Sequence, residues 1–475
     1  MKKTILRIVC FMLVLGATLY GVNRVFKVKY LDGIYSMTKF YELDKNSVDV
    51  LFLGSSHAFE NFNTGTMWDE FGNASYILGG SFQPLWNTYY YLKEALKTQT
   101  PKVIVLEGYM TKLDEDYMDD SRIIKNNYGM HWSLNRLNSL KASAPRERWA
   151  EFMLANEQYH KRYTELSSGD FLKNQNYTLY DDWKGLGLNM ATTPLEMIDV
   201  TTIDDRKELY GKTEKYYRMI IELAKSKDIP IVVVISPYAG ITEERMQQFN
   251  KAYDIAKEYD VPYINYNLFI EDMGLEFLTD AADPAHLNYK GNQKFTAYFG
   301  RWLNSEFDIP DHRGDKDYES WQRNADYIRE MIYNQQLLEC YNTDTISLKL
   351  CNENYWVVIS IDGSADVYNP VVSKFLNDMG IEGDEDGGMW LRENNGVIWA
   401  SGSESSKQYI RSKSHDFCLE RRPDENGFYA NYVIMDRVSY KMVPDGINVV
   451  VFDSKTECMV DVFAFDKNCD YAIVR

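Results

Sequence analysis

Cysteine is scarce in this chain and unevenly placed. The 475 residues include six cysteines, and none lies between Cys10 and Cys340. The stretch between these two residues therefore has no disulfide, and the five later cysteines leave at least one thiol unpaired within a monomer. The sequence has no Cys-x-x-Cys pair and no adjacent pair of histidines. Because zinc sites use such spacings, we predict no metal ion and no cofactor.

Basic residues are also in deficit. The chain has 52 Lys and Arg against 70 Asp and Glu, which gives a formal net charge of −18. Binding to nucleic acid depends on a basic face that neutralises phosphates, so we predict no nucleic-acid partner. The aromatic share of 14% is high. Aromatic side chains often contact carbohydrate, although most of them fill cores.

One long apolar run stands at the start of the chain. It extends from Ile8 to Val22, and Lys2, Lys3 and Arg7 precede it. This pattern predicts a secretory signal or a short signal-anchor, with a buried soluble helix as the alternative. No small-x-small cleavage site follows, so we favour an uncleaved anchor over 1–25. The basic start places the N-terminus in the cytoplasm and the bulk of the chain outside a cell membrane that it crosses once.

Residues 47–306 alternate between buried strands and amphipathic helices. This order predicts an α/β domain with a parallel sheet. The polar, tyrosine-rich segment 109–205 interrupts the alternation, and we expect a helical insertion above the carboxyl ends of the strands, either binding an acceptor or packing over the sheet. The expected strands are 49–53, 74–78, 102–106, 229–235 and 262–265, and the expected helices are 82–96, 205–227, 242–258 and the segment after His286.

Two short segments carry the residues for a nucleophilic site. Gly54-Ser55-Ser56 follows the first expected strand, and a serine at a strand-to-helix corner lies near free backbone N–H groups and the positive end of the helix dipole. Asp283-Pro284-Ala285-His286 precedes the last helix of the domain. An imidazole oriented by a carboxylate is the base that such a serine needs. The two segments together predict a serine site.

These segments resemble the SGNH/GDSL hydrolase superfamily, and the resemblance covers about residues 47–306. Gly54-Ser55-Ser56 is similar to the first block of the family, and Asp283 and His286 are similar to its last block. The resemblance implies a flavodoxin-like parallel sheet flanked by helices. It also implies that Ser56 is the nucleophile, His286 the general base and Asp283 its orienting partner. Ser-Ser-His versions of the first block are similar to those of envelope proteins that move acyl groups, such as D-alanyl-lipoteichoic acid biosynthesis proteins.

The resemblance also implies an oxyanion hole. Ile77-Leu78-Gly79-Gly80-Ser81 is similar to the second block, so the N–H groups of Gly80 and Ser56 are the expected donors. The third block normally supplies an Asn, but the matching segment 106–110 has none. Either another group, for which the Tyr109 hydroxyl is the candidate, replaces that donor, or the enzyme is slow with water. We expect His57 to contact the substrate. The other four histidines are expected to be surface residues without acidic partners: His131, His160, His312 and His415.

The rest of the chain has a different pattern. We expect a stalk over 26–46, a linker helix over 307–342 and a second small α/β domain over 343–475. In that domain, 355–361 and 448–452 are expected as strands and 369–379 as a helix. The motif Gly446-Ile447-Asn448-Val449-Val450-Val451-Phe452-Asp453 resembles the interleukin-like EMT-inducer (pander-like) domain, which implies a glycan-binding or protein-binding module. The acidic, glycine-rich run 382–388 is expected to be a solvated loop.

The predicted function is therefore serine O-acyl transfer to cell-surface polysaccharide by a membrane-anchored protein. In similar systems a membrane-bound O-acyltransferase passes the acyl group across the bilayer, and the resemblance implies such a partner. Two alternatives stay open: an esterase that removes acetyl groups from surface glycans, and a non-catalytic glycan-binding or scaffolding protein.

Overall fold

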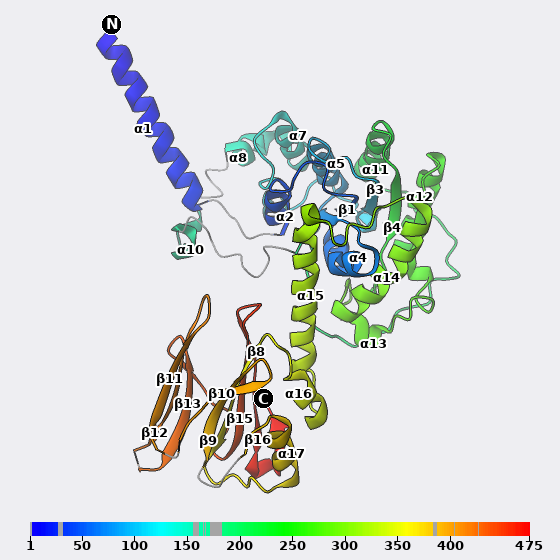
Figure 1. Ribbon diagram of the computed structural model, residues 1–475. Helices are drawn as coiled ribbons and strands as arrows, with labels where there is room; N and C mark the ends of the chain where they lie inside the picture. The colour runs from blue at the N-terminus through cyan, green and yellow to red at the C-terminus, as the bar shows by residue number, and fades with distance from the viewer. Residues whose placement is uncertain are drawn as a thin grey trace. The chain divides into compact units, whose positions relative to one another are not determined.

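The computed structural model describes residues 2–26, 32–154, 161–164, 166, 168–171, 183–382, 387–402, 404–425 and 427–475. The chain divides into two compact units, Met1–Asp326 and Tyr327–Arg475 (Figure 1). The predicted surface residue His160 and much of the predicted loop 382–388 lie outside the described residues.

The first helix, α1 (Lys2–Phe26), contains the predicted apolar run. Its segment Lys3–Phe26 is long and apolar enough to cross a membrane, and a signal sequence would have the same properties. The large apolar side chains along it are exposed, with Leu13 at 68% and Phe11 at 64%. The structure thus agrees with an N-terminal segment suited to an apolar environment.

A five-stranded parallel sheet forms the centre of the first unit, in the order β2-β1-β3-β4-β5. Its strands are rich in Val, Ile and Leu and are almost wholly buried, as expected of a parallel sheet covered on both faces. Each strand agrees with its predicted position to within a few residues. The strands are β1 (Val50–Gly54), β2 (Ser75–Gly79), β3 (Val103–Glu107), β4 (Ile231–Ile235) and β5 (Tyr263–Asn265).

Helices cover both faces of this sheet. On one face Leu51 and Leu53 share a core with apolar side chains of α5 (Leu85–Ala95), α11 (Gly211–Lys225) and α12 (Glu243–Glu258). On the other face α14 (Tyr289–Glu306) lies against β1, and the rings of Phe299 and Phe52 are 6.1 Å apart. The remaining helices near the sheet are α3 (Ser56–Asn61), α4 (Thr64–Phe71) and α13 (Phe277–Asp280).

The predicted stalk differs from the structure over residues 32–40. These residues form α2 (Asp32–Phe40), in which Ile34, Met37 and Phe40 are buried. The Ser36 hydroxyl donates a hydrogen bond of 2.9 Å to the carbonyl of Gly79, at the end of β2. Because its apolar side is covered, α2 belongs to the folded unit rather than to a spacer.

The predicted insertion is helical only in part. Its described portion begins with the 3-10 turn η1 (Tyr109–Lys112), and residues 183–210 have no regular secondary structure. The segments 155–160 and 172–182 lie outside the described residues. The other elements are α6 (Asp120–Lys125), α7 (Leu134–Ser143), η2 (Arg146–Arg148), α8 (Trp149–Leu154), η3 (Lys161–Thr164) and α10 (Ser168–Phe171).

The segment predicted as a linker helix contributes to core packing. It contains η5 (Lys316–Tyr318) and α15 (Glu319–Leu338), a helix that spans the boundary between the units. Trp321 and Ala325 are buried in the core of the first unit, and Leu337 is buried in that of the second. The described part of 307–342 is therefore no exposed connector.

The second unit has a six-stranded sheet in the order β10-β9-β8-β15-β16-β17, with every neighbouring pair antiparallel. Helices α16 (Thr343–Lys349) and α17 (Pro370–Asp378) share a core with one face. A second sheet, β11-β12-β13-β14, shares a core with the other face through Leu391, Leu419 and Val433. The predicted strands at 355–361 and 448–452 and the helix at 369–379 are confirmed.

The strands of the second unit are β8 (Tyr355–Asp362), β9 (Gly388–Glu393), β10 (Gly396–Ala400), β11 (Ser406–Arg411), β12 (Asp416–Pro423), β13 (Tyr429–Met435), β14 (Val438–Tyr440), β15 (Gly446–Asp453), β16 (Cys458–Asp466) and β17 (Ala472–Val474). Two hairpins turn at residue pairs with positive φ, Asn394-Asn395 and Asp436-Arg437. Such pairs match the right-handed twist of the flanking strands. All six cysteines are free thiols.

Candidate active site

Ser56 lies at a tight corner between β1 and α3. Gly54 ends the strand, Ser55 is the N-cap, and Ser56 is the first residue of the helix. A Cβ atom on Gly54 would lie 2.9 Å from Cβ of Glu107 and 3.0 Å from Cβ of Ala58, so only glycine fits this approach. The first N–H groups of a helix have no partner within it. The corner therefore presents a hydroxyl beside free backbone donors.

His286 is held by the loop before α14. The strands β6 (Ala281–Asp283) and β7 (His286–Leu287) form a small antiparallel pair. The Asp283 carboxylate accepts backbone hydrogen bonds from Ala285 at 2.7 Å and from His286 at 3.1 Å. Asn288 caps α14 by accepting from the N–H groups of Lys290 and Gly291. The loop is thus fixed at both ends.

The two segments meet in space as predicted. The Oγ atom of Ser56 lies 2.8 Å from Nε2 of His286. On the other side of the ring, Nδ1 lies 3.0 and 2.9 Å from the two carboxylate oxygens of Asp283. An Asp283 carboxylate that accepts from Nδ1–H leaves the Nε2 lone pair directed at the serine hydroxyl. This is the arrangement of a nucleophile, a base and an orienting acid.

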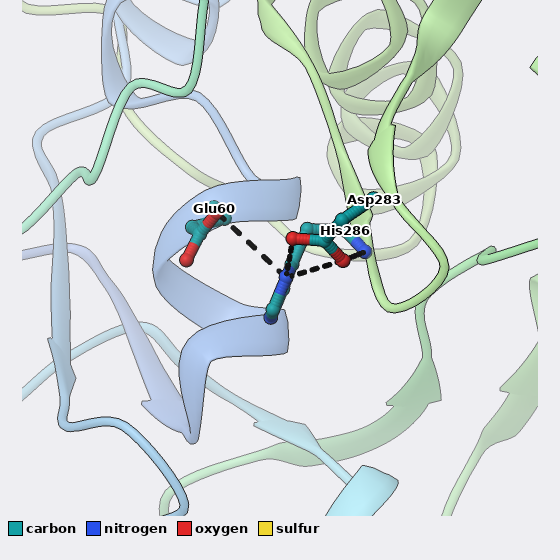
Figure 2. A group of neighbouring side chains, drawn as sticks. All are labelled: Glu60, Asp283 and His286. Atoms are coloured by element: carbon teal, nitrogen blue, oxygen red, sulfur yellow. Dashed lines mark hydrogen bonds and ion pairs between the residues drawn. The ribbon is translucent and has the colours of Figure 1, made fainter. Parts of the chain in front are cut away.

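Glu60 is a further acid at this site that the sequence prediction missed. Figure 2 shows it on α3, reaching toward His286, and its Oε2 lies 3.9 Å from Nδ1. Burial raises the pKa of Glu60, while the His286 charge and a hydrogen bond from Asn189 oppose the rise. Glu60 lies one helical turn after Ser56, and residues at i and i+4 share a helix face. That spacing was a usable signal.

Glu60, Asp283 and His286 are also the described residues able to hold a metal ion. One ligand atom from each lies within 4.8 Å of the other two (Figure 2). A metal ion would bind the lone pair of Nδ1. That lone pair is absent when Nδ1 carries the proton that it donates to Asp283. Metal binding at this cluster and general-base action by Nε2 therefore exclude each other.

Asn61 connects the two halves of the site, and sequence reasoning did not identify it. Its side-chain oxygen accepts a hydrogen bond of 2.9 Å from the backbone N–H of Leu287. Its amide nitrogen donates to the Ser236 hydroxyl, also at 2.9 Å, just beyond β4. Asn61 is fully buried. One side chain thus joins α3, the His286 loop and the end of β4.

Gly80 lies at the same edge of the sheet as Ser56. It follows the last register pair of β1 and β2, in which Gly54 stands opposite Gly79. A Cβ on Gly80 would come within 2.4 Å of the Asn126 side-chain oxygen and 2.9 Å of Cα of Gly33. The close packing against α2 and α6 requires glycine here. Gly80 thus lies one residue beyond the strand pair, and its role as an oxyanion donor stays a prediction.

His57 is too deeply buried to contact a substrate, which is the role predicted for it. It is 0% exposed, and neither ring nitrogen has a hydrogen-bond partner among the described residues. Its ring stacks on Tyr109, with centroids 3.4 Å apart, and lies 5.3 Å from the His286 ring. Burial lowers the pKa of His57 well below its usual value, and the charges of His286 and Lys112 add to this effect. His57 therefore packs beneath the site as a neutral ring rather than touching a substrate.

Tyr109 also differs from its predicted role. Its hydroxyl contacts the Lys112 ammonium, not Ser56, and that ammonium lies 3.6 Å from the centre of the Tyr109 ring. Burial and the nearby Glu107 raise the pKa of Tyr109 to about 12. The ring supports His57, and the hydroxyl is engaged with a cation. The contacts of Tyr109 thus do not supply the missing oxyanion donor.

Glu107 occupies the segment where an Asn was expected. It ends β3 and is 1% exposed, and it accepts from the Tyr109 N–H at 3.1 Å and from the Ser236 hydroxyl at 3.3 Å. Burial raises its pKa to about 8, although these hydrogen bonds and Lys112 oppose the rise. The carboxyl group is therefore largely protonated at neutral pH and adds little negative charge beneath the serine.

Two histidines predicted to lack acidic partners have them. His312 Nε2 lies 2.8 Å from a carboxylate oxygen of Asp49, and His415 Nδ1 lies 2.5 Å from one of Asp436. His131 stacks on Tyr41 with centroids 3.8 Å apart. Each partner is distant in sequence, so the prediction failed where tertiary folding brings the acids in.

In comparisons with known proteins, no family model matches the chain and no curated protein sequence is significantly similar to it. Any functional assignment therefore depends on the geometry described above.

Proposed function

We propose that this protein is a serine acyltransferase of the cell envelope, with Ser56 as nucleophile, His286 as general base and Asp283 as orienting acid. The observation that carries the proposal is the continuous line of contacts from Ser56 Oγ to His286 at 2.8 Å and from His286 to Asp283 at 2.9 Å. Ser56 and His286 lie 230 residues apart in the chain.

In the proposed reaction, Nε2 of His286 accepts the proton of the Ser56 hydroxyl while Oγ attacks an ester or thioester carbonyl. The tetrahedral intermediate collapses, the donor alkoxide or thiolate leaves with the proton from His286, and an acyl-serine forms. A glycan hydroxyl then attacks the acyl-serine, with His286 again taking its proton. The glycan leaves as an ester and Ser56 regains its hydrogen.

The proposed oxyanion hole uses the N–H groups of Ser56 and Gly80. The position of Ser56 at the start of α3 and the position of Gly80 just beyond β2 support this assignment. Losing one such donor typically costs a hundredfold or more in rate. Because the contacts of Tyr109 do not supply a third donor, the proposed enzyme works with two, which suits slow transfer to a well-bound acceptor.

We also propose that the first unit belongs to the SGNH/GDSL superfamily, and its strand order supports this assignment. The order β2-β1-β3-β4-β5 is that of flavodoxin-like sheets, and the proposed nucleophile follows β1 at the carboxyl edge, where such sheets bind ligands. The apolar helix α1 supports an anchored protein with its bulk outside the membrane. A membrane-bound O-acyltransferase as acyl donor and a surface polysaccharide as acceptor complete the proposal.

Hydrolysis is the second candidate, and one observation favours it. The side chain of Asp283 is 43% exposed and that of His286 is 16% exposed. Water therefore reaches the base, and it can replace the glycan hydroxyl as acceptor. Incubation with p-nitrophenyl acetate and an oligosaccharide separates the two functions, because transfer yields an acetylated sugar and hydrolysis yields acetate.

We also propose that the second unit has the fold of the interleukin-like EMT-inducer domain. Its motif forms β15, whose residues are all buried. The motif thus supports a shared core, and the proposed glycan or protein binding would depend on other residues of the unit.

A fluorophosphonate probe tests the proposal directly. Attack by Ser56 Oγ on phosphorus expels fluoride and adds a stable mass to that serine. We expect labelling of the full chain that Ser56→Ala abolishes. Ser55→Ala is the matched control, because this neighbouring hydroxyl is buried and has no partner among the described residues. An unlabelled, folded wild-type protein would refute both catalytic functions and leave the non-catalytic alternative.

A further inference from the structure

Two cations lie at the carboxyl edge of the sheet. Lys112 ends η1, which follows β3, and Arg245 lies in the first turn of α12, which follows β4. Within the described part of the chain, neither side chain forms an ion pair.

The two cations are close together because of direct contacts. The Arg245 guanidinium donates through Nη1 to the backbone carbonyl of Lys112 at 3.1 Å and to Gln248 at 2.8 Å. These contacts leave Nε and Nη2 of Arg245 unpartnered among the described residues. Among the described residues, the Lys112 ammonium contacts the Tyr109 hydroxyl and ring. Both groups are half-buried, and a half-buried charge without a counter-ion is unfavourable.

A third polar group at this place also has no partner. The Tyr238 side chain is 3% exposed, and its hydroxyl has no hydrogen-bond partner within the described residues. Its ring packs edge-on against Tyr109 with centroids 5.3 Å apart and against His57 at 4.9 Å. An unpaired buried hydroxyl costs free energy, so a ligand that accepts its hydrogen bond would be favoured there.

Contacts between rings connect these groups with the site that contains Ser56. The Tyr109 ring contacts both the Lys112 ammonium and the His57 ring, and the His57 ring lies 5.3 Å from the ring of His286. The nearest carboxyl group below them, Glu107, is largely protonated because burial raises its pKa to about 8. Burial and the Arg245 charge lower the pKa of Lys112 to about 8, although the charge of Glu107 opposes this shift. Two cations thus lie close together next to a carboxyl group that is largely protonated.

We propose that Lys112 and Arg245, with the Tyr238 hydroxyl, bind a carboxylate or phosphate group of an acidic sugar at the edge of the sheet that carries Ser56. This inference rests on the proposed function, because it names the acceptor as an anionic glycan. Charge-assisted hydrogen bonds from the two cations would replace the missing ion pairs. In a chain that repels anions at long range, local cations also select the part of the surface where an acidic glycan can bind.

Titration calorimetry on the full-length Ser56→Ala protein tests the inference without turnover. The probes are trigalacturonate, which carries carboxylates, neutral galactotriose, and glucose 6-phosphate. We expect trigalacturonate or glucose 6-phosphate to bind at least about tenfold more tightly than galactotriose, and to bind more weakly at higher salt. The tighter of the two acidic probes identifies the group as a carboxylate or a phosphate.

Variants in the same background assign the effect to residues. Lys112→Met and Arg245→Gln should each weaken acidic-probe binding about tenfold, and Lys112→Arg should restore it. Lys257→Met, an exposed position on α12, removes the same charge without effect. Thermal unfolding establishes that each variant is folded. Equal affinity for acidic and neutral probes, or insensitivity to both charge-removing variants, would overturn the inference.

The fluorophosphonate experiment separates this failure from that of the proposed function. Labelling of Ser56 without a preference for acidic sugars would refute only the anionic acceptor. A preference for acidic sugars without labelling would retain the binding site and refute the acyltransferase.

Discussion

Asn61 accepts a hydrogen bond of 2.9 Å from the backbone N–H of Leu287, the residue that follows His286. The same side chain donates to Ser236, so it sets the distance between the helix that starts at Ser56 and the loop that carries the base. A buried side chain that joins two elements in this way controls geometry as well as stability.

Replacing Asn61 with Ala should therefore lower both the stability of the fold and the reactivity of Ser56. It leaves the Leu287 N–H buried without a partner, which costs about 1–3 kcal/mol. We expect a loss of unfolding free energy in urea of that size and a drop of at least about tenfold in the rate of fluorophosphonate labelling. Asn304→Ala is the control, because Asn304 pairs with Asn73 near the other end of α14. Equal labelling rates for both variants would contradict the positioning role of Asn61.

Asp283 and Glu60 both lie near Nδ1 of His286, but their distances predict different effects. At 2.9 Å the Asp283 carboxylate accepts the Nδ1 proton, and at 3.9 Å Glu60 acts only through its charge. We expect Asp283→Asn to lower kcat for p-nitrophenyl acetate by about a thousandfold, because an amide favours the wrong tautomer. Glu60→Gln should change kcat less than about tenfold. A larger effect of the Glu60 variant would reverse the two assignments.

The strands and the serine site could be predicted because local sequence specifies them. The run Val50–Leu53 is apolar enough to be buried on both faces, and Gly54-Ser55-Ser56 permits a corner that larger side chains would block. The Asp283–His286 contact is equally local, since the residues are three apart. Spacing alone brings these groups together, whereas the contact between Ser56 and His286 spans 230 residues and was expected from the family resemblance.

Other contacts between distant segments, to which no resemblance pointed, were missed. His312 meets Asp49 across 263 positions, and Asn61 meets Ser236 across 175. Nothing near either residue in the sequence indicates these contacts. The helix at 32–40 was missed because its buried positions pack on β2 and on residues after β3, which a local pattern does not reveal. The stacking of His57 on Tyr109 has the same origin.

Glu107 gives the fold a dependence on pH. Its carboxyl group titrates near 4.5 when unfolded and at about 8 when folded, so the native state binds more protons between those values. The stability that its protonation contributes is complete below about pH 4.5 and is lost as the pH rises through 8. We expect Glu107→Gln to lose less unfolding free energy than wild type between pH 5.5 and about pH 8.5. Parallel curves in urea unfolding would contradict the assignment.

His57 gives the opposite dependence. Burial holds the pKa of His57 well below its ordinary value of 6.5, so the unfolded state binds more protons as the pH falls below 6.5. Native stability therefore decreases on acidification through that range. His57→Phe keeps a ring against Tyr109 and removes two unpartnered nitrogens, a change that is neutral or stabilising when shape is kept.

We expect the His57→Phe protein to keep its unfolding free energy between about pH 7 and pH 5 better than wild type, and to retain labelling of Ser56 by the fluorophosphonate probe. His131→Phe is a suitable control, because that ring also stacks on a tyrosine but lies at an exposed position. Loss of labelling with an intact fold would show that His57 acts in the chemistry, since a ring that only packs beneath Ser56 can be exchanged for another. Equal acid sensitivity of the two variants would instead show that His57 is protonated in the native state.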